Sequence, residues 1–197
     1  MFLMMKISRY FLLTVLIFSA SAAMAIQEPA YRSLISEPPF EHRAYSDYVV
    51  AETEISGDFD AASTKGFRRV AAYIFGENSL PNGEVKKIAM TAPVTVEAKP
   101  SGWRLHFVMP DSENLDSLPK PKNAEVHLRK IAAHQMAVIR FSGWTTKASI
   151  EEQTEKLKVW IGAKHLKIAG PPQVARYDDP FTLPWRRRNE IMIPVLP

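Results

Sequence analysis

The sequence of 197 residues contains no cysteine, and this absence excludes several classes of protein. Without a thiol, the chain forms no disulfide, carries no lipid on an N-terminal cysteine and uses no thiol nucleophile. Its stability must therefore come from a hydrophobic core, and 46% hydrophobic residues are enough to build one.

Standard catalytic and metal-binding patterns are missing as well. The chain has no G-x-S-x-G nucleophile motif, no glycine-rich phosphate loop and no H-E-x-x-H zinc motif. The five histidines show no spacing typical of metal ligands; they are His42, His106, His127, His134 and His165. We predict no catalytic residue and no metal site. Whether the protein is an enzyme stays open, with a binding protein favoured.

Basic and acidic residues are nearly balanced in number. The chain has 25 basic and 21 acidic residues. Two of the basic residues, Lys6 and Arg9, lie in the N-terminal segment, so the remainder carries a net charge of only +2 (23 − 21). A balance this small gives no reason to expect nucleic acid as a partner.

An apolar run near the N-terminus has the features of an export signal. Lys6 and Arg9 precede the run Tyr10–Phe18, and Ala23-Met24-Ala25 follows it, which is the order of a secretory signal peptide. The run is shorter than the about 20 residues that a membrane span needs, although an uncleaved anchor is the alternative. We predict that residues 1–25 are removed on export to the periplasm or the exterior. One domain of 172 residues (197 − 25) then remains, with no later membrane span.

Three landmarks recur at a fixed offset of 86 residues (129 − 43). They are Arg43 and Arg129, Ser56-Gly57 and Ser142-Gly143, and Gly76 and Gly162. A fixed spacing of this kind indicates two copies of one supersecondary unit. We predict two pseudo-repeats, 37–110 and 122–197, each a strand-helix-strand-strand unit, after an N-terminal extension of residues 26–36.

Alternating apolar residues predict the strands, and a period of about 3.6 residues predicts two helices. The expected strands cover residues 40–45, 49–55, 87–97, 103–109, 125–131, 136–141, 173–177 and 190–195. The first helix begins at Asp58 or Asp60 and ends at Gly76. The second begins at Thr146, or at the capping box Ser149–Glu152.

The segment 175–193 combines prolines, aromatic residues and a triple arginine. A loop of this composition is expected to fold over something apolar, so we predict that Phe181 and Trp185 are buried against the sheet. The arginines either pair with nearby carboxylates such as Glu190 or hold an anion.

Several motifs, in this order, resemble the SOUL haem-binding family. They are Glu41–Tyr45, Lys87–Val94 as K-x-x-M-T-x-P-V, Phe141–Gly143, and Tyr177–Phe181 followed by Arg187–Glu190. The resemblance covers about residues 37–195. It implies an α+β fold in which an internally duplicated unit forms a distorted β-barrel or curved antiparallel sheet with two packed helices.

The resemblance also implies reversible binding of haem or a related tetrapyrrole. Some members of that family ligate the iron through a histidine in the opening strand, and others hold the macrocycle in an apolar groove beside the first helix. Aligned on the opening motif, the ligating position is Ala44 here, so we expect no strong axial ligand. His42, two residues away on the same face of a strand, is the candidate substitute.

The groove of the family corresponds to residues 65–75 of this chain. Haem is a flat apolar plate with two carboxylates on one edge, so it needs apolar contacts and nearby cations. The candidate ligand-binding residues are Lys65, Phe67, Arg68, Arg69, Ala71 and Ala72, together with His42. The alternative is that the apolar residues form only the core face. Gly66 costs a helix about 1 kcal/mol relative to Ala, which would be tolerated if something packs closely there.

Three functions remain open at this point. The first is a carrier or scavenger of a tetrapyrrole in an extracytoplasmic compartment. The second is an enzyme acting on a tetrapyrrole or another hydrophobic small molecule. The third is a small-molecule effector-binding module, although the chain has no DNA-binding part and carries an export signal.

Overall fold

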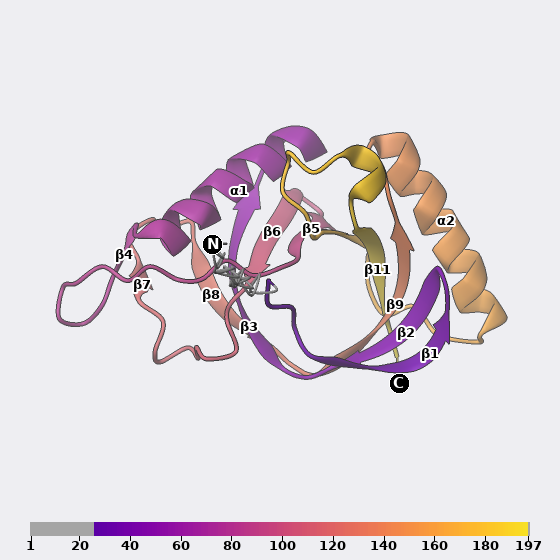
Figure 1. Cartoon of the computed structure of the whole chain (residues 1–197), viewed down its shortest axis with the longest axis horizontal. Helices are drawn as coiled ribbons and strands as arrows, with labels where there is room; N and C mark the ends of the chain where they lie inside the picture. The colour runs from indigo at the N-terminus through magenta and orange to yellow at the C-terminus, as the bar shows by residue number, and fades with distance from the viewer. Residues whose placement is uncertain (1–25, 197) are drawn as a thin grey trace, which may run out of the picture.

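The structure, a computed structural model, describes residues 26–196; the predicted signal peptide, residues 1–25, lies outside this range. Within it, nine strands form one antiparallel sheet that curls into a half-barrel, with two helices on its outer face (Figure 1). The large sheet consists of β1 (Tyr31–Glu37), β2 (Phe40–Tyr45), β3 (Tyr48–Ile55), β5 (Val94–Lys99), β6 (Gly102–Val108), β8 (His127–Ile131), β9 (His134–Phe141), β10 (Gln173–Arg176) and β11 (Asn189–Val195). The remaining elements are α1 (Phe59–Phe75), β4 (Asn78–Ser79), β7 (Lys120–Pro121), α2 (Lys147–Ala163) and the 3₁₀ turn η1 (Pro184–Arg186). The predicted α+β class, with a curved antiparallel sheet and two packed helices, is confirmed.

The strand order is β1-β2-β9-β11-β10-β5-β6-β3-β8, so β10 and β5 join the two halves at the centre of the sheet. The segment 87–97 departs from its prediction, because regular strand begins only at Val94. Pro93 has no N–H to donate to a ladder, and Thr91 donates its hydroxyl to the carbonyl oxygen of Val108 at 2.5 Å instead.

The two halves place their elements in the same order, β2-β3-α1-β5-β6 and β8-β9-α2-β10-β11. Gly57 and Gly143, which follow the equivalent strands β3 and β9, have φ angles of 111° and 100°. The helix starts, however, differ by 88 residues (147 − 59) rather than by 86. Internal duplication therefore stays a prediction, to be tested by superposing the halves. Residues 31–37, within and beside the predicted extension 26–36, form the edge strand β1 against β2.

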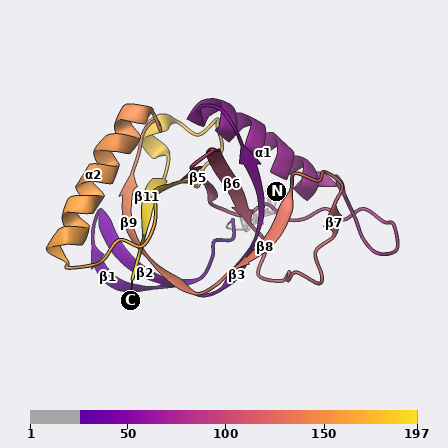
Figure 2. The same cartoon turned by 180° about the vertical axis from the view of Figure 1, so that it is seen from behind.

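Each helix covers its own part of the outer face (Figure 2). Helix α1 contacts β3 and β6, and α2 contacts β9 and β11. Side chains cap both helices, because Asp58 accepts from the N–H of Ala61 at 2.8 Å and Thr146 accepts from the N–H of Ser149 at 3.2 Å. The capping position of α2 is therefore Thr146, and Ser149 lies inside the helix.

Gly66 lets α1 approach the sheet closely. A Cβ atom at this position would lie 3.1 Å from the Cβ atom of Leu105 on β6. That separation is tighter than ordinary van der Waals contact, so a larger residue would push the helix outward. Strand β6 is thus what packs closely at Gly66, and this contact sets the position of α1 on the sheet.

The concave face of the sheet carries buried charges. Successive side chains of a strand point to opposite faces, so Arg43 and Glu190 face away from the helices. Glu190 is fully buried and accepts hydrogen bonds from Arg43 at 2.8 Å, the Tyr177 hydroxyl at 2.7 Å and Arg188 at 3.0 Å. We call these four residues the Glu190 cluster. The sequence predicts that the arginines of the segment 175–193 either pair with nearby carboxylates or hold an anion. Arg188 pairs with a carboxylate of the protein.

Candidate functional site

An apolar groove of about 360 Å³ lies beside α1. One wall is α1, the floor is the outer face of the sheet, and two connecting segments close the remaining sides. Its lining consists of Ile26, Ser63, Thr64, Phe67, Arg68, Met90, Thr91, Ala92, Val94, Val96, Leu105 and residues 176–180. We call it the α1 groove. Its size lies within the range of about 300–1,000 Å³ that is usual for small-molecule sites.

The helix wall combines an aromatic ring with a cation. Phe67 is 37% exposed, and its ring centroid lies 5.3 Å from that of the core residue Phe107. One side of the Phe67 ring is therefore supported by the core while the other faces the groove. Arg68 follows directly on the same wall and is exposed. The wall can contact an apolar plate and meet an anionic group at its edge.

Two sequence motifs supply the opposite walls. Residues 90–92 are held by the Thr91 bond to β6 and by a 2.9 Å hydrogen bond from the N–H of Ala92 to the carbonyl of Gln27. Residues 176–180 lead out of β10. These segments are far apart in sequence, so only the curled sheet brings them to the same groove.

Two buried polar atoms in the groove have no hydrogen-bond partner among the described residues. They are the hydroxyl oxygen of Ser63 and the Nε atom of Arg176. Burial lowers the pKa of Arg176, and its guanidinium lies 5.0 Å from the centre of the Phe59 ring rather than against a carboxylate. Unsatisfied buried polar groups cost about 1–3 kcal/mol each. A ligand with acceptor atoms at this end of the groove would remove that cost.

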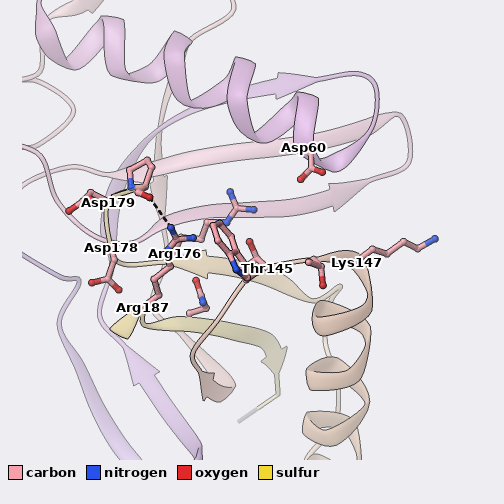
Figure 3. Close-up of a pocket in the computed structure, with 11 residues that line it drawn as sticks. Asp60, Thr145, Lys147, Arg176, Asp178, Asp179 and Arg187 are labelled. Carbon is pink, nitrogen blue, oxygen red and sulfur yellow. Dashed lines mark hydrogen bonds between the residues drawn. The ribbon is translucent and has the colours of Figure 1, made fainter. Parts of the chain in front are cut away.

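A polar pocket of about 460 Å³ adjoins the α1 groove (Figure 3). The two hollows share Arg176 and residues 178–180. Figure 3 shows Asp60 and Lys147 at the ends of the two helices, on either side of this pocket. The side chain of Arg187 donates to the carbonyl of Pro180 at 2.8 Å, which fixes the shared wall. The apolar groove thus opens at one end into a charged region.

The structure separates the predicted site residues into three groups. Phe67 and Arg68 line the α1 groove. Arg69 points to β3, where it donates to the hydroxyl of Thr53 at 2.9 Å and pairs with Glu125 at 2.7 Å. The others lie outside the groove lining: Ala71 is buried in the core, Ala72 is half-buried, and Lys65 is exposed.

His42 lies on a different part of the molecule. It is buried on β2, and its Nε2 atom is 2.7 Å from the side-chain oxygen of Gln135. Its strand neighbour on the same face, Phe40, stacks on Trp160 of α2 with ring centroids 5.5 Å apart. This part of the sheet is covered by α2, whereas the groove lies beside α1.

The prediction that Phe181 and Trp185 are buried is wrong. Phe181 is 94% exposed and Trp185 is 70% exposed. The loop is anchored by polar bonds instead, because Arg187 donates to the carbonyl oxygens of Thr182 and Pro180, each at 2.8 Å. These bonds leave the aromatic side chains directed outward.

Sequence reasoning missed Ser63, Met90 and Arg176 as lining residues. A signal for two of them was present, because Met90 lies in the K-x-x-M-T-x-P-V motif and Arg176 directly precedes the Tyr177–Phe181 motif. Across residues 26–196, no cluster of three or more histidine and acidic residues is arranged to hold a metal ion. In the same range, no helix is both long and apolar enough to span a membrane.

Two curated relatives align with most of this chain. Heme-binding protein 1 of Xenopus laevis is 26% identical over 160 residues, which cover 77% of this chain and 81% of the relative. Heme-binding protein 2 of Homo sapiens is 28% identical over 145 residues, which cover 68% of each protein.

Solved structures share the fold at low sequence identity. An uncharacterized conserved protein from Listeria innocua matches with a TM-score of 0.61 and 11% identity, covering 80% of this chain and 92% of that one. The EcmrR C-terminal domain matches with a TM-score of 0.58 and 13% identity, covering 84% and 98%. The family model described as SOUL heme-binding protein matches residues 26–194. The chain therefore belongs to the SOUL heme-binding protein family.

Proposed function

We propose that this protein reversibly binds haem or a related tetrapyrrole in the α1 groove, as an extracytoplasmic carrier or scavenger. One observation carries the proposal: the apolar groove ends at Arg176, whose buried Nε atom has no partner among the described residues. An apolar plate with carboxylates on one edge matches this arrangement, because Arg68 and Arg176 offer charge-assisted bonds. The names of the two curated relatives support the same ligand class.

The residues present suit the macrocycle better than the iron. Histidine is absent from the groove lining, and the Met90 thioether is the one soft donor there. Apolar contact with the ring therefore supplies most of the affinity in this proposal. The features of a signal peptide in residues 1–25 support the extracytoplasmic compartment.

Haemin should bind the chain lacking residues 1–25 with a dissociation constant of about 1 μM or below. The double substitution Arg68→Ala and Arg176→Gln should raise this constant about tenfold or more, because sheltered charge-assisted bonds contribute about 1.5–3 kcal/mol. Titration followed in the Soret band measures both. Arg69→Ala is the matched control, since Arg69 is held by Thr53 and Glu125 outside the groove. Equal weakening by Arg69→Ala would refute the assignment of the groove.

Iron-free protoporphyrin should bind about as tightly as haemin, because the proposal assigns the iron no strong protein ligand. His42→Ala should leave the bound haem spectrum unchanged, since His42 lies on the α2 side of the sheet. Fluorescence titration with protoporphyrin and absorption spectra of the variant test these points. Loss of the haem spectrum in His42→Ala, with the arginine variants unaffected, would instead establish ligation from the opening strand.

A further inference from the structure

Four large apolar side chains are exposed together beside the α1 groove. Phe181 is 94% exposed, Trp185 70%, Trp144 60% and Leu183 47%. Three of them lie on the loop between β10 and β11, and Trp144 follows the end of β9. We call these four residues the apolar tip. The loop lies at the upper edge of the molecule, between the first turns of α1 and α2 (Figure 1).

The apolar tip is held firmly in its exposed position. The Asp179 carboxylate accepts from the N–H groups of Phe181 and Thr182 at 2.7 and 3.0 Å. The Gly143 N–H donates to the carbonyl of Pro184 at 2.9 Å, which ties the loop to the exit of β9. The Arg187 guanidinium lies 4.3 Å from the centre of the Trp144 ring. These bonds fix the loop in a shape that directs its aromatic side chains to the outside.

The tip fits a lipid surface better than a protein partner. Buried aromatic side chains cover about 150–250 Å² each, so the partly exposed tip offers on the order of 500 Å². A standard protein interface buries about 800 Å² from each partner, a little over half of it apolar, so this area fits either kind of partner. The composition favours a bilayer, because tryptophan, phenylalanine and leucine beside cationic residues are usual for interfacial anchors.

The charges around the tip are compatible with anionic lipid. Lys147, on the same rim, has a side chain that is 91% exposed, and Arg186 beside Trp185 is exposed as well. Asp178 and Asp179 are also close, and the backbone N–H groups that their carboxylates accept do not cancel their negative charge. Asp60 adds one more negative charge to the rim. We therefore expect apolar insertion to dominate and anionic headgroups to strengthen it only modestly.

We infer that the apolar tip inserts into the interfacial layer of a membrane and places the mouth of the α1 groove at the lipid surface. Asp179 and Pro180 belong to both the loop and the groove, so the two are continuous. An apolar tetrapyrrole dissolved in the membrane would then enter or leave the groove without crossing water. The membrane contact stands on the exposed side chains alone, whereas its role in ligand transfer rests on the proposed function.

Vesicles of phosphatidylcholine with phosphatidylglycerol test the inference through co-sedimentation with the chain lacking residues 1–25. The double substitution Phe181→Ser and Trp185→Ser should lower the partition coefficient at least tenfold. Phe75→Ser is the matched control, because Phe75 is 59% exposed at the far end of α1 and should leave partitioning unchanged. Lipids brominated on the acyl chains should quench tryptophan fluorescence, and replacing both tryptophans of the tip, Trp144→Phe with Trp185→Phe, should remove most of the quenching.

Haemin titration of the Phe181→Ser, Trp185→Ser variant without vesicles separates this inference from the proposed function. Neither side chain lines the groove, so the affinity for haemin should be unchanged. Failure of the wild-type protein to bind vesicles, or equal loss in Phe75→Ser, would overturn the membrane contact even if haemin binds. Self-association that depends on the tip, detected by analytical ultracentrifugation, would assign the surface to a second copy of the chain and also overturn it.

Discussion

Glu190→Gln should lower the free energy of unfolding by about 3 kcal/mol or more, because it removes one partner from a buried ionic cluster. The side chains of Glu190 and Arg43 are 0% and 3% exposed. Arg43 donates twice to the carboxylate, at 2.8 and 3.1 Å, and Arg188 donates at 3.0 Å. A neutral amide would remove the fully buried charge that both guanidinium groups share, and would leave Arg43 only with Glu41 and Arg188 only with Glu28 as carboxylate partners.

Urea denaturation at pH 7 measures this loss. Glu54→Gln is the control, since Glu54 also pairs with an arginine, Arg104, at 2.9 Å but has a side chain that is 57% exposed. Exposed pairs contribute about 1 kcal/mol or less, so the control should change stability little. Similar effects of the two substitutions would show that the Glu190 cluster does not stabilise the fold as inferred.

Stability should also fall by about 2–3 kcal/mol between pH 7 and pH 4.5, because of His106. Burial lowers the pKa of His106 from 6.5 to about 4, with Glu52, Arg104, Arg129 and His134 as the other contributing groups. The unfolded chain therefore takes up a proton near pH 6.5, whereas the folded protein does not until about pH 4. Stability is complete above pH 6.5 and declines as the pH falls through this window.

His106→Asn should flatten that decline, which denaturation curves at several pH values will show. His165→Asn is the control, because His165 is exposed and its φ of 55° is one that Asn also adopts readily. Burial would raise the pKa of Glu190, but the hydrogen bonds and charges of Arg43 and Arg188 outweigh it and lower the pKa. Because the pKa of Glu190 is lowered from its ordinary value of 4.5, its contribution is lost at a lower pH than that of the histidine. An unchanged slope in His106→Asn would contradict the assignment.

Local pattern was enough to predict most of the secondary structure. The alternation in residues 49–55 and the cap at Asp58 correspond to β3 and the start of α1. Such features depend on neighbours within a few residues, which the sequence states directly. Strand β1 had no comparable signal, because it exists through its pairing with β2. Family membership likewise followed from short motifs that keep their order along the chain.

The course of the loop between β10 and β11 could not be predicted from its composition. Aromatic residues in a loop are usually buried, and that rule gave the wrong result for Phe181 and Trp185. The loop is instead ordered by polar bonds from Asp179 and Arg187 to its own backbone. Whether aromatic burial or polar bonds to the backbone shape a loop depends on distances between groups, and the spacing of residues in the sequence does not supply those distances.

The sequence by itself determined that α1 presents both cations and apolar residues, and it drew attention to Arg68 and Arg69 together. Consecutive helix positions point about 100° apart, so only one of the two can face a given groove. The tertiary structure decided between them, because the contact of Gly66 with Leu105 sets how α1 lies on β6. It also brought Arg176 to the same groove across more than a hundred residues of chain. Such convergence arises from the curl of the sheet, which no local pattern encodes.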